Sequence, residues 1–339
     1  MKEVFTLSIV LLLLFFKGNA QVTHEDYFRS GNFKSDKKEF KAAIVDYTNA
    51  LTLNNELHEV YYNRGIAYLS IENFDAAIQD FTDAVKLKPN FPEAIGNRGL
   101  AYFNLKKYVE AMNDYNAALV LKNDFHEVYF NRGNLKVKRN KFDEAIVDYT
   151  KVLELNPEFV QAISNRGDAY FEMGNYSKAI ADFSKAIELD SKNSKLYYNR
   201  GNAKFSKEMY QDAVVDFNLA IDLNSKYMEA YYNRAVVKSI IGDNSGAIED
   251  YNEILKVFPE DGETYVGRGI SKYRLDDFDG AIMDYTYAIA IDASNSEAYY
   301  NRGLSKLVLN QKENACTDFK KALDFKHSSA AEALKKYCH

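Results

Sequence analysis

The amino-acid sequence predicts an all-α solenoid in which nine helix-turn-helix repeats of 34 residues are followed by a C-terminal capping helix. The first observation behind this prediction is the triplet Asn-Arg-Gly, which occurs in one register at Asn63, Asn97, Asn131, Asn165, Asn199 and Asn301. Asn233-Arg234-Ala235 and Gly267-Arg268-Gly269 are two altered copies in the same register. A constant period near 34 residues indicates stacked units that pack against their neighbours. The second observation is that each unit contains two apolar patterns of helical period, separated by a polar turn.

A common numbering makes the repeats comparable. With Gly65 placed at position 8, the repeats begin at residues 24, 58, 92, 126, 160, 194, 228, 262 and 296. Position 20 is alanine in all nine repeats, position 8 is glycine except at Ala235, and position 24 is always aromatic. Glycine inside a helix costs about 1 kcal/mol relative to alanine unless close packing compensates. We therefore expect the glycine to face the alanine across the two helices, with the aromatic side chain beside them, and residues 21–339 to form a single solenoid.

Opposite charges recur in the same register. Position 7 is arginine in eight repeats and position 23 is aspartate in all nine, while the first repeat has Ser30 instead of arginine. We expect a structural ladder rather than a ligand site. Because the first repeat lacks an arginine, we predict that each aspartate pairs with the arginine of the following repeat. The predicted pairs are Asp46–Arg64, Asp80–Arg98, Asp114–Arg132, Asp148–Arg166, Asp182–Arg200, Asp216–Arg234, Asp250–Arg268 and Asp284–Arg302.

The first twenty residues differ from the rest of the chain. Lys2 precedes an apolar run from Leu7 to Phe16, which ends at small residues including Gly18 and Ala20. This pattern is typical of a cleaved secretory signal, and the run is shorter than the roughly 20 residues that span a bilayer. We expect cleavage after Ala20 and a secreted or periplasmic mature chain, with an uncleaved N-terminal anchor as the alternative.

Both cysteines lie near the C-terminus. A last amphipathic helix is expected at about 329–338, where it would cover the apolar face of the ninth repeat. Cys316 and Cys338 lie about equally far from the preceding turn, so antiparallel helices would bring them together, and an oxidising compartment then favours a disulfide. A zinc site that adds His327 and His339 is a weaker alternative, because no CxxC or HxxxH spacing supports it. Free thiols in the core are the remaining option.

The pattern of an aromatic residue at position 4, glycine at 8, alanine at 20 and an aromatic residue at 24 resembles the tetratricopeptide repeat. The resemblance extends from residue 24 to about residue 329, and the Ala-Cys and Tyr-Cys ends resemble secreted members from Gram-negative bacteria. It implies a right-handed superhelix in which the first helix of each repeat lines a concave face. Arginine at position 7 and tyrosine or isoleucine at position 4 depart from the usual family residues.

On this implied concave face, position 6 forms a row of asparagines: Asn63, Asn97, Asn131, Asn165, Asn199, Asn233 and Asn301. An amide both donates and accepts hydrogen bonds, so such a row could hold the backbone of an extended peptide, as in some relatives. The alternative is that these amides serve only neighbouring helices. Position 5 adds groove aromatics: Phe28, Tyr62, Phe130, Tyr198, Tyr232 and Tyr300. Position 2 is mostly glutamate and position 5 is never lysine, which disfavours the carboxylate clamp of chaperone-binding members.

No enzyme is expected from the sequence. The five histidines fit no metal or nucleophile motif, and we predict no cofactor. A formal charge of −6 makes nucleic acid an improbable partner. We predict a non-catalytic protein-interaction scaffold that binds an extended peptide or partner protein along its groove. A binder of glycan or another cell-envelope polymer is the alternative, because asparagine and tyrosine also suit sugars, although the lack of tryptophan weighs against it.

Overall fold

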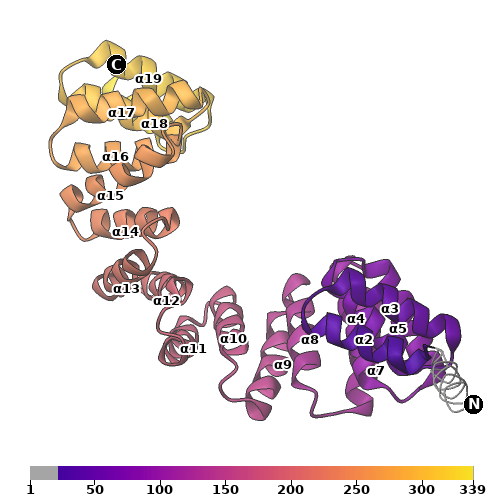
Figure 1. Ribbon diagram of the computed structural model, residues 1–339. Helices are drawn as coiled ribbons and strands as arrows, with labels where there is room; N and C mark the ends of the chain where they lie inside the picture. The colour runs from indigo at the N-terminus through magenta and orange to yellow at the C-terminus, as the bar shows by residue number, and fades with distance from the viewer. Residues whose placement is uncertain (1–21, 339) are drawn as a thin grey trace, which may run out of the picture. The chain divides into compact units, whose positions relative to one another are not determined.

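The computed structural model of the protein describes residues 22–338, and every regular element in that range is an α-helix. Successive helices pair as antiparallel hairpins, and within each of the two units described below the hairpins stack side by side (Figure 1). The predicted secretory signal and its expected cleavage after Ala20 fall outside the described residues. Within residues 22–338, no helix combines the length and the apolar composition needed to cross a bilayer.

The described residues divide into two compact units, residues 22–157 and residues 158–338. The first unit contains α2 (His24–Asp36), α3 (Phe40–Leu53), α4 (His58–Ser70), α5 (Phe74–Leu87), α6 (Pro92–Asn104), α7 (Tyr108–Leu121), α8 (His126–Lys138) and α9 (Phe142–Leu155). These helices make up repeats 1 to 4, and the first helix of each begins at the residue from which its repeat is numbered.

Repeats 5 to 9 and the cap form the second unit. It contains α10 (Val160–Glu172), α11 (Tyr176–Leu189), α12 (Ser194–Ser206), α13 (Tyr210–Leu223), α14 (Met228–Ile240), α15 (Asn244–Val257), α16 (Gly262–Arg274), α17 (Phe278–Ile291), α18 (Ser296–Val308), α19 (Lys312–Asp324) and α20 (Ala330–Tyr337). Within each unit, the first helices of consecutive repeats contact one another, whereas consecutive second helices make no comparable contact among the described residues. The first helices therefore lie on the inner side of each stack, and their open surface is called the groove face below.

Every first helix ends in the same left-handed turn. In repeat 1 the N–H of Lys38 bonds to the carbonyl of Ser35, and the N–H of Glu39 bonds to that of Lys34, which is the Schellman arrangement. Position 15 has a positive φ in all nine repeats, yet it is glycine only at Gly174 and Gly242. The turn is thus set by helix-end hydrogen bonding and packing, and does not require the residue type best suited to it.

The repeated glycine at position 8 packs against the aromatic ring at position 24 of its own repeat. A Cβ atom placed on Gly201 would lie 2.8 Å from Cε1 of Phe217, and the other helical position-8 glycines approach their rings as closely. The alanine at position 20 is fully buried in all nine repeats. Glycine and ring therefore oppose each other directly, where we expected glycine to face alanine with the ring beside them. Position 8 is glycine because the flat ring occupies the volume of a side chain.

Repeats 7 and 8 contain one coupled exception. Ala235 replaces the position-8 glycine, and the ring of Tyr251 turns so that it lies at 70° to Tyr232, compared with 50° for the equivalent Tyr198–Phe217 pair. The turned ring reaches the next repeat, where a Cβ on Gly267 would lie 2.7 Å from both Cζ and the hydroxyl oxygen of Tyr251. The two altered copies of the triplet are therefore coupled through packing. Ala235 displaces the Tyr251 ring, and Gly267 leaves the space that the displaced ring occupies.

This coupling predicts non-additive substitutions. Gly267→Asn, which restores the usual residue, is expected to destabilise repeats 7 and 8 by about 2 kcal/mol because the new side chain meets the Tyr251 ring. Adding Ala235→Gly should let the ring return and recover at least about 1 kcal/mol of that loss. Amide hydrogen exchange of α14 to α17 measures both values. Strictly additive effects would show that Ala235 does not control the ring.

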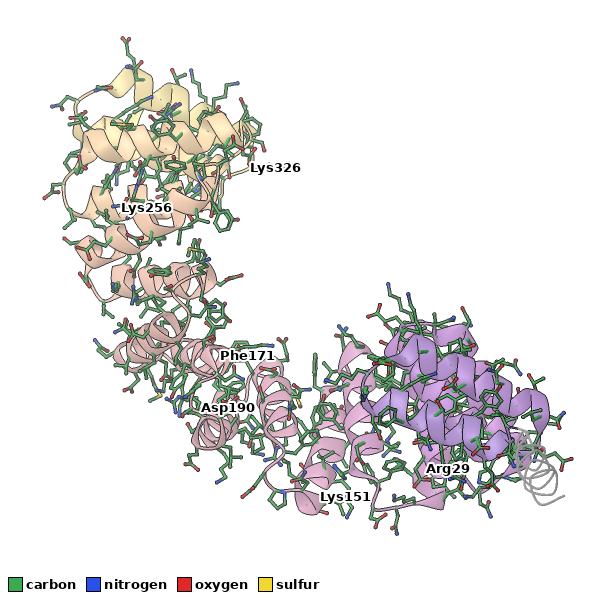
Figure 2. All side chains as sticks on the ribbon, in the orientation of Figure 1. Arg29, Lys151, Phe171, Asp190, Lys256 and Lys326 are labelled. Atoms are coloured by element: carbon green, nitrogen blue, oxygen red, sulfur yellow. A yellow bond between two sulfur atoms is a disulfide. The ribbon has the colours of Figure 1, made fainter. Side chains whose placement is uncertain are left out.

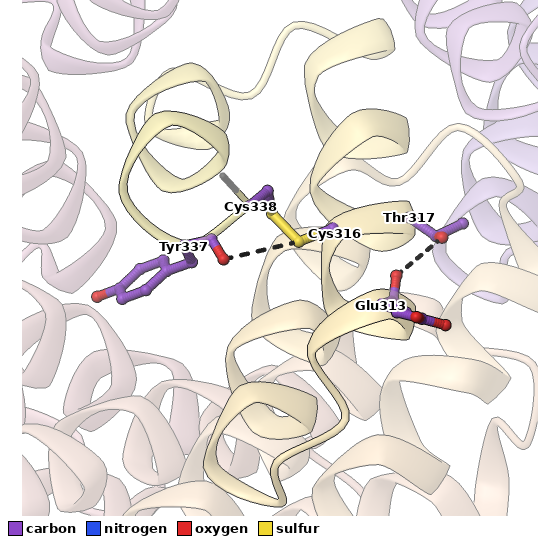
Figure 3. The surroundings of a disulfide bond; sticks show 5 residues. All are labelled: Glu313, Cys316, Thr317, Tyr337 and Cys338. Atoms are coloured by element: carbon purple, nitrogen blue, oxygen red, sulfur yellow. Dashed lines mark hydrogen bonds between the residues drawn. A yellow bond between two sulfur atoms is a disulfide. The ribbon is translucent and has the colours of Figure 1, made fainter.

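The C-terminal cap is held covalently. Cys316 on α19 and Cys338 after α20 form a disulfide with a Cα–Cα distance of 5.7 Å (Figure 3), which confirms the predicted pairing. Because the two sulfurs are bonded to each other, neither is a thiolate available to the alternative zinc site. Ala330 and Ala333 of α20 are buried, and Tyr337 stacks against the core ring of Phe319. The cap thus closes the apolar face of repeat 9.

Candidate functional site

The arginines at position 7 pair with aspartate within their own repeat, so the predicted pairing between repeats is wrong. Arg98 donates from Nε and Nη2 to both carboxylate oxygens of Asp114 at 2.8 Å, and not to Asp80. The same bidentate geometry joins Arg64–Asp80, Arg132–Asp148, Arg166–Asp182, Arg200–Asp216, Arg234–Asp250, Arg268–Asp284 and Arg302–Asp318. Asp46, which we expected to pair with Arg64, bonds to Ser30 and Lys34.

The correction follows from hairpin geometry. Positions 7 and 23 lie equally far from the turn at position 15, so antiparallel helices place them face to face. The link between repeats uses the remaining guanidinium nitrogen instead: Nη1 of Arg200 donates to the hydroxyl of Ser184 in the preceding repeat at 3.0 Å. Arg64, Arg98, Arg132, Arg234, Arg268 and Arg302 make the equivalent bond to a threonine or asparagine. All three guanidinium nitrogens of these arginines thus bond within the chain, and we assign them a structural role.

A lysine at position 11 strengthens many of these pairs. Lys204 lies 2.7 Å from Asp216, and Lys34, Lys136, Lys238, Lys272 and Lys306 occupy the same place in their repeats. Repeat 2 has Tyr68 there instead. Burial raises the pKa of Asp80 in that repeat, with Arg64 acting in the opposite direction. Sequence reasoning missed the lysines, although their spacing from the aspartates is as regular as that of the arginines.

The asparagines at position 6 lie half-buried on the groove face, and several use one N–H internally. Asn63 donates to Asn32, Asn199 to Asp168, and Asn97 to the Tyr62 hydroxyl of the preceding repeat. Asn233 donates to both Tyr198 and Asn202, while Asn301 bonds within its own helix to Glu297. The row is therefore partly structural, as the alternative to peptide binding requires.

These internal bonds also fix which way the amides face. An ionised Asp168 carboxylate has acceptor atoms and no donor, so the amide nitrogen of Asn199 must face it. Burial raises the pKa of Asp168 to about 6. The side-chain oxygens of Asn63, Asn97, Asn199 and Asn233 accept no hydrogen bond among the described residues, and Asn131 makes no side-chain hydrogen bond there at all. The groove face thus presents a row of amide oxygens that could accept hydrogen bonds from a ligand. At Asn131 both the amide oxygen and the amide nitrogen are available.

The predicted groove aromatics rest on the core rings of their own repeats. Centroid distances are 6.0 Å for Tyr62–Phe81 and Tyr198–Phe217, and 5.9 Å for Tyr232–Tyr251. Phe28, Phe130 and Tyr300 pack in the same way. Tyr300 also stacks on His327 with centroids 4.1 Å apart, so the cap covers one of its faces. These rings contribute one edge or face to the surface and are not freely exposed.

A pocket of about 530 Å³ opens on the groove face of the first unit. The predicted residues Tyr62, Asn97 and Asn131 line it, together with acidic and basic side chains of repeats 3 and 4. Lys122 lies 3.2 Å from Glu93, and its Nζ stands 4.6 Å from the centroid of the Phe125 ring. Lys122 thus supplies a cation to Glu93 from within the chain, while Asp124 and Glu127 also line the pocket.

Two adjoining pockets open on the groove face of the second unit. One of about 320 Å³ is lined by Tyr198, Met228, Glu229, Tyr232, Asn233, Ile254, Phe258, Asp261 and Glu263. The other, of about 480 Å³, shares Tyr232 and Glu263 with it and extends over Gly267 to Arg274. Both contain groove residues that the sequence predicted. Phe258 and Arg274 were not predicted, because neither belongs to a repeated pattern.

No group of three or more His, Cys, Asp or Glu side chains within residues 22–338 is placed to hold a metal ion. Charged side chains away from the groove, such as Lys151 and Lys256 in Figure 2, pair with glutamates three residues away along their helices and remain about half exposed or more. Exposed pairs of this kind contribute roughly 0–1 kcal/mol each. The groove face therefore carries the candidate functional residues.

Sequence models of the tetratricopeptide repeat match residues 58–91, 194–227 and 296–326. A model of the TPR repeat matches residues 99–138, 133–174 and 167–208. Together these matches cover more than half of the 339 residues. No curated protein matches the chain.

Solved structures show the same fold. A tetratricopeptide repeat protein from Parabacteroides merdae is 22% identical, with a TM-score of 0.54 over 73% of this chain and 99% of that one. The C-terminal part of a TPR repeat-containing protein from Cytophaga hutchinsonii is 19% identical, with a TM-score of 0.62 over 71% of this chain and 98% of that one. The MamA protein is 28% identical, with a TM-score of 0.48 over 51% of this chain and 94% of that one.

Proposed function

Because the chain belongs to the tetratricopeptide repeat family, whose arrays serve as protein-interaction scaffolds and are typically non-catalytic, we propose that its groove face binds an extended peptide segment of a partner protein. The observation that carries this proposal is the unused hydrogen-bonding capacity of the asparagine row. Asn97, Asn131 and Asn233 line groove pockets, and the oxygens of Asn97 and Asn233 and the whole amide of Asn131 have no partner in the described chain.

The hydrogen-bonding groups of these amides suit a peptide backbone. An extended strand presents an N–H and a carbonyl at every residue, whatever its sequence. Amide side chains can meet both groups, and the neighbouring aromatic edges offer apolar contact to the peptide's side chains. We further propose that this binding takes place outside the cytoplasm, since residues 1–20 have the pattern of a secretory signal. The chain would then act as a secreted or periplasmic scaffold with no chemistry of its own.

Asn131→Ala is expected to weaken peptide binding by about threefold to tenfold, which corresponds to the loss of one or two modest hydrogen bonds. The mature chain is panned against displayed random nonapeptides, and the selected peptides are titrated by fluorescence anisotropy. Stability should not change, because Asn131 makes no side-chain hydrogen bond to the described chain.

Asn113→Ala is the matched control, since Asn113 is exposed on the second helix α7 and is expected to leave affinity unchanged. Equal affinity of the wild type and the Asn131 variant would remove the asparagine row from the binding surface. Failure of the wild type to select any peptide would overturn the proposed function itself.

A further inference from the structure

The smaller groove pocket of the second unit has an unusual combination of walls. Three aromatic rings (Tyr198, Tyr232 and Phe258) line it together with three carboxylates (Glu229, Asp261 and Glu263), and no described residue that lines it is basic. Phe258 is 51% exposed, although it is a large apolar side chain. Carboxylates attract a cation, and aromatic faces attract it further through the ring quadrupole.

Two of the three carboxylates have no partner among the described residues. Glu229 and Glu263 accept no side-chain hydrogen bond and form no ion pair among the described residues. Asp261 is fixed in place because its carboxylate caps α16, accepting from the backbone of Glu263 and Thr264. Burial raises the pKa of the Tyr232 hydroxyl, and the negative charges of Glu263 and Asp261 raise it further. The pocket is therefore a region of negative potential that a bound cation would relieve.

In repeat 3, the equivalent positions include a lysine, so the chain itself supplies a cation there. There, position 2 is Glu93, position 31 is Lys122 and position 34 is Phe125. The lysine lies 3.2 Å from the glutamate, with its Nζ 4.6 Å from the centroid of the phenylalanine ring. In repeat 7 these positions are Glu229, Phe258 and Asp261, so the acid and an aromatic ring remain while the cation is missing.

We infer that this pocket receives an arginine or lysine side chain of the bound segment, an assignment that rests on the proposed binding of an extended peptide. Asn233 lines the same pocket and would bond to the peptide backbone beside that side chain. The volume of about 320 Å³ is at the lower end of the range for small-ligand sites, which suits one long side chain. A bare metal ion fits less well, because the carboxylates do not converge as a coordination group.

The test compares wild type with the Glu229→Gln/Glu263→Gln double variant. Both chains are panned against displayed random nonapeptides, and a selected peptide is resynthesised with citrulline in place of its arginine, or acetyl-lysine in place of its lysine. In the wild type, the neutral analogue should bind about tenfold more weakly, from one cation–π contact and close carboxylates. In the double variant, that ratio should fall below about threefold. Phe258→Leu, which keeps the charge and removes the ring, should reduce the ratio by about threefold.

Glu188→Gln/Glu253→Gln is the matched control, because it makes the same change in charge on two second helices of the same unit, where each glutamate pairs with a lysine three residues away and lines no groove pocket. It should leave the ratio at about tenfold, since it lies outside the pocket. Peptides that show no preference for basic residues, or a neutral analogue of equal affinity, would overturn the cation pocket while leaving peptide binding in place. If no peptide is selected by the wild type, the proposed function and the pocket assignment fail together.

Discussion

Asp216→Ala is expected to destabilise repeat 6 by about 3–5 kcal/mol, the cost of leaving buried charges without their counterion. Asp216 is 0% exposed, and both of its oxygens are bound by Arg200 at 2.7–2.9 Å. Lys204 adds a second cation at 2.7 Å. Removing the carboxylate strands two positive charges between the helices, and the smaller side chain leaves a void as well.

Hydrogen exchange of the amides in α12 and α13 measures this loss locally, which suits an array whose repeats need not unfold together. Glu253→Ala provides the contrast, because its partner Lys256 is exposed and one helical turn away. That variant should change stability by less than about 0.5 kcal/mol. A loss below about 1 kcal/mol for Asp216→Ala would show that water solvates the two cations despite their burial.

Removal of the disulfide is the second large effect expected. Cys316→Ala/Cys338→Ala should destabilise the cap and repeat 9 by about 3 kcal/mol, because the bond closes a loop with a sequence separation of 22. With only eight residues, α20 is too short to persist alone, so it should detach and uncover the Phe319 ring that Tyr337 stacks on.

Exchange rates in α18 to α20 report this change, and reduction of the wild type with dithiothreitol should reproduce it. The helices of repeats 5 and 6 serve as an internal reference, because a one-dimensional stack transmits the loss weakly beyond the nearest repeat. Unchanged exchange in α20 after reduction would mean that packing alone holds the cap.

The periodic part of this structure follows from the sequence, because nine copies average out local ambiguity. The 34-residue register predicts where each first helix begins, and antiparallel geometry predicts the Cys316–Cys338 bond. The same geometry would have paired Arg98 with Asp114. The missing arginine of repeat 1 pointed the other way, since the substitute Lys34 at position 11 went unrecognised. The prediction of pairs between repeats thus relied on the first repeat alone, although the antiparallel geometry of every hairpin favoured pairs within a repeat.

The groove is harder to read from the sequence, because its individual features lie where the repeat pattern breaks. Asn131 and Tyr232 were predicted because their rows repeat. Phe258 replaces a lysine that occurs only in some repeats, and Gly267 matters through a ring that Ala235 displaces. Such effects depend on contacts between residues of different repeats, which cannot be inferred from the residue type at one repeat position.

Position 15 bears on how this array can change over time. Lys38, Glu72, Lys106, Asn140, Glu208, Asp276 and Asn310 hold a backbone conformation that costs an L-residue about 1 kcal/mol more than glycine. All seven are exposed at the hairpin turns, and none lines a groove pocket described here. Substitution of glycine at these turns can therefore raise thermal stability without changing the residues of the groove. Stability and binding preference thus depend on different positions of the same 34-residue unit and can evolve separately.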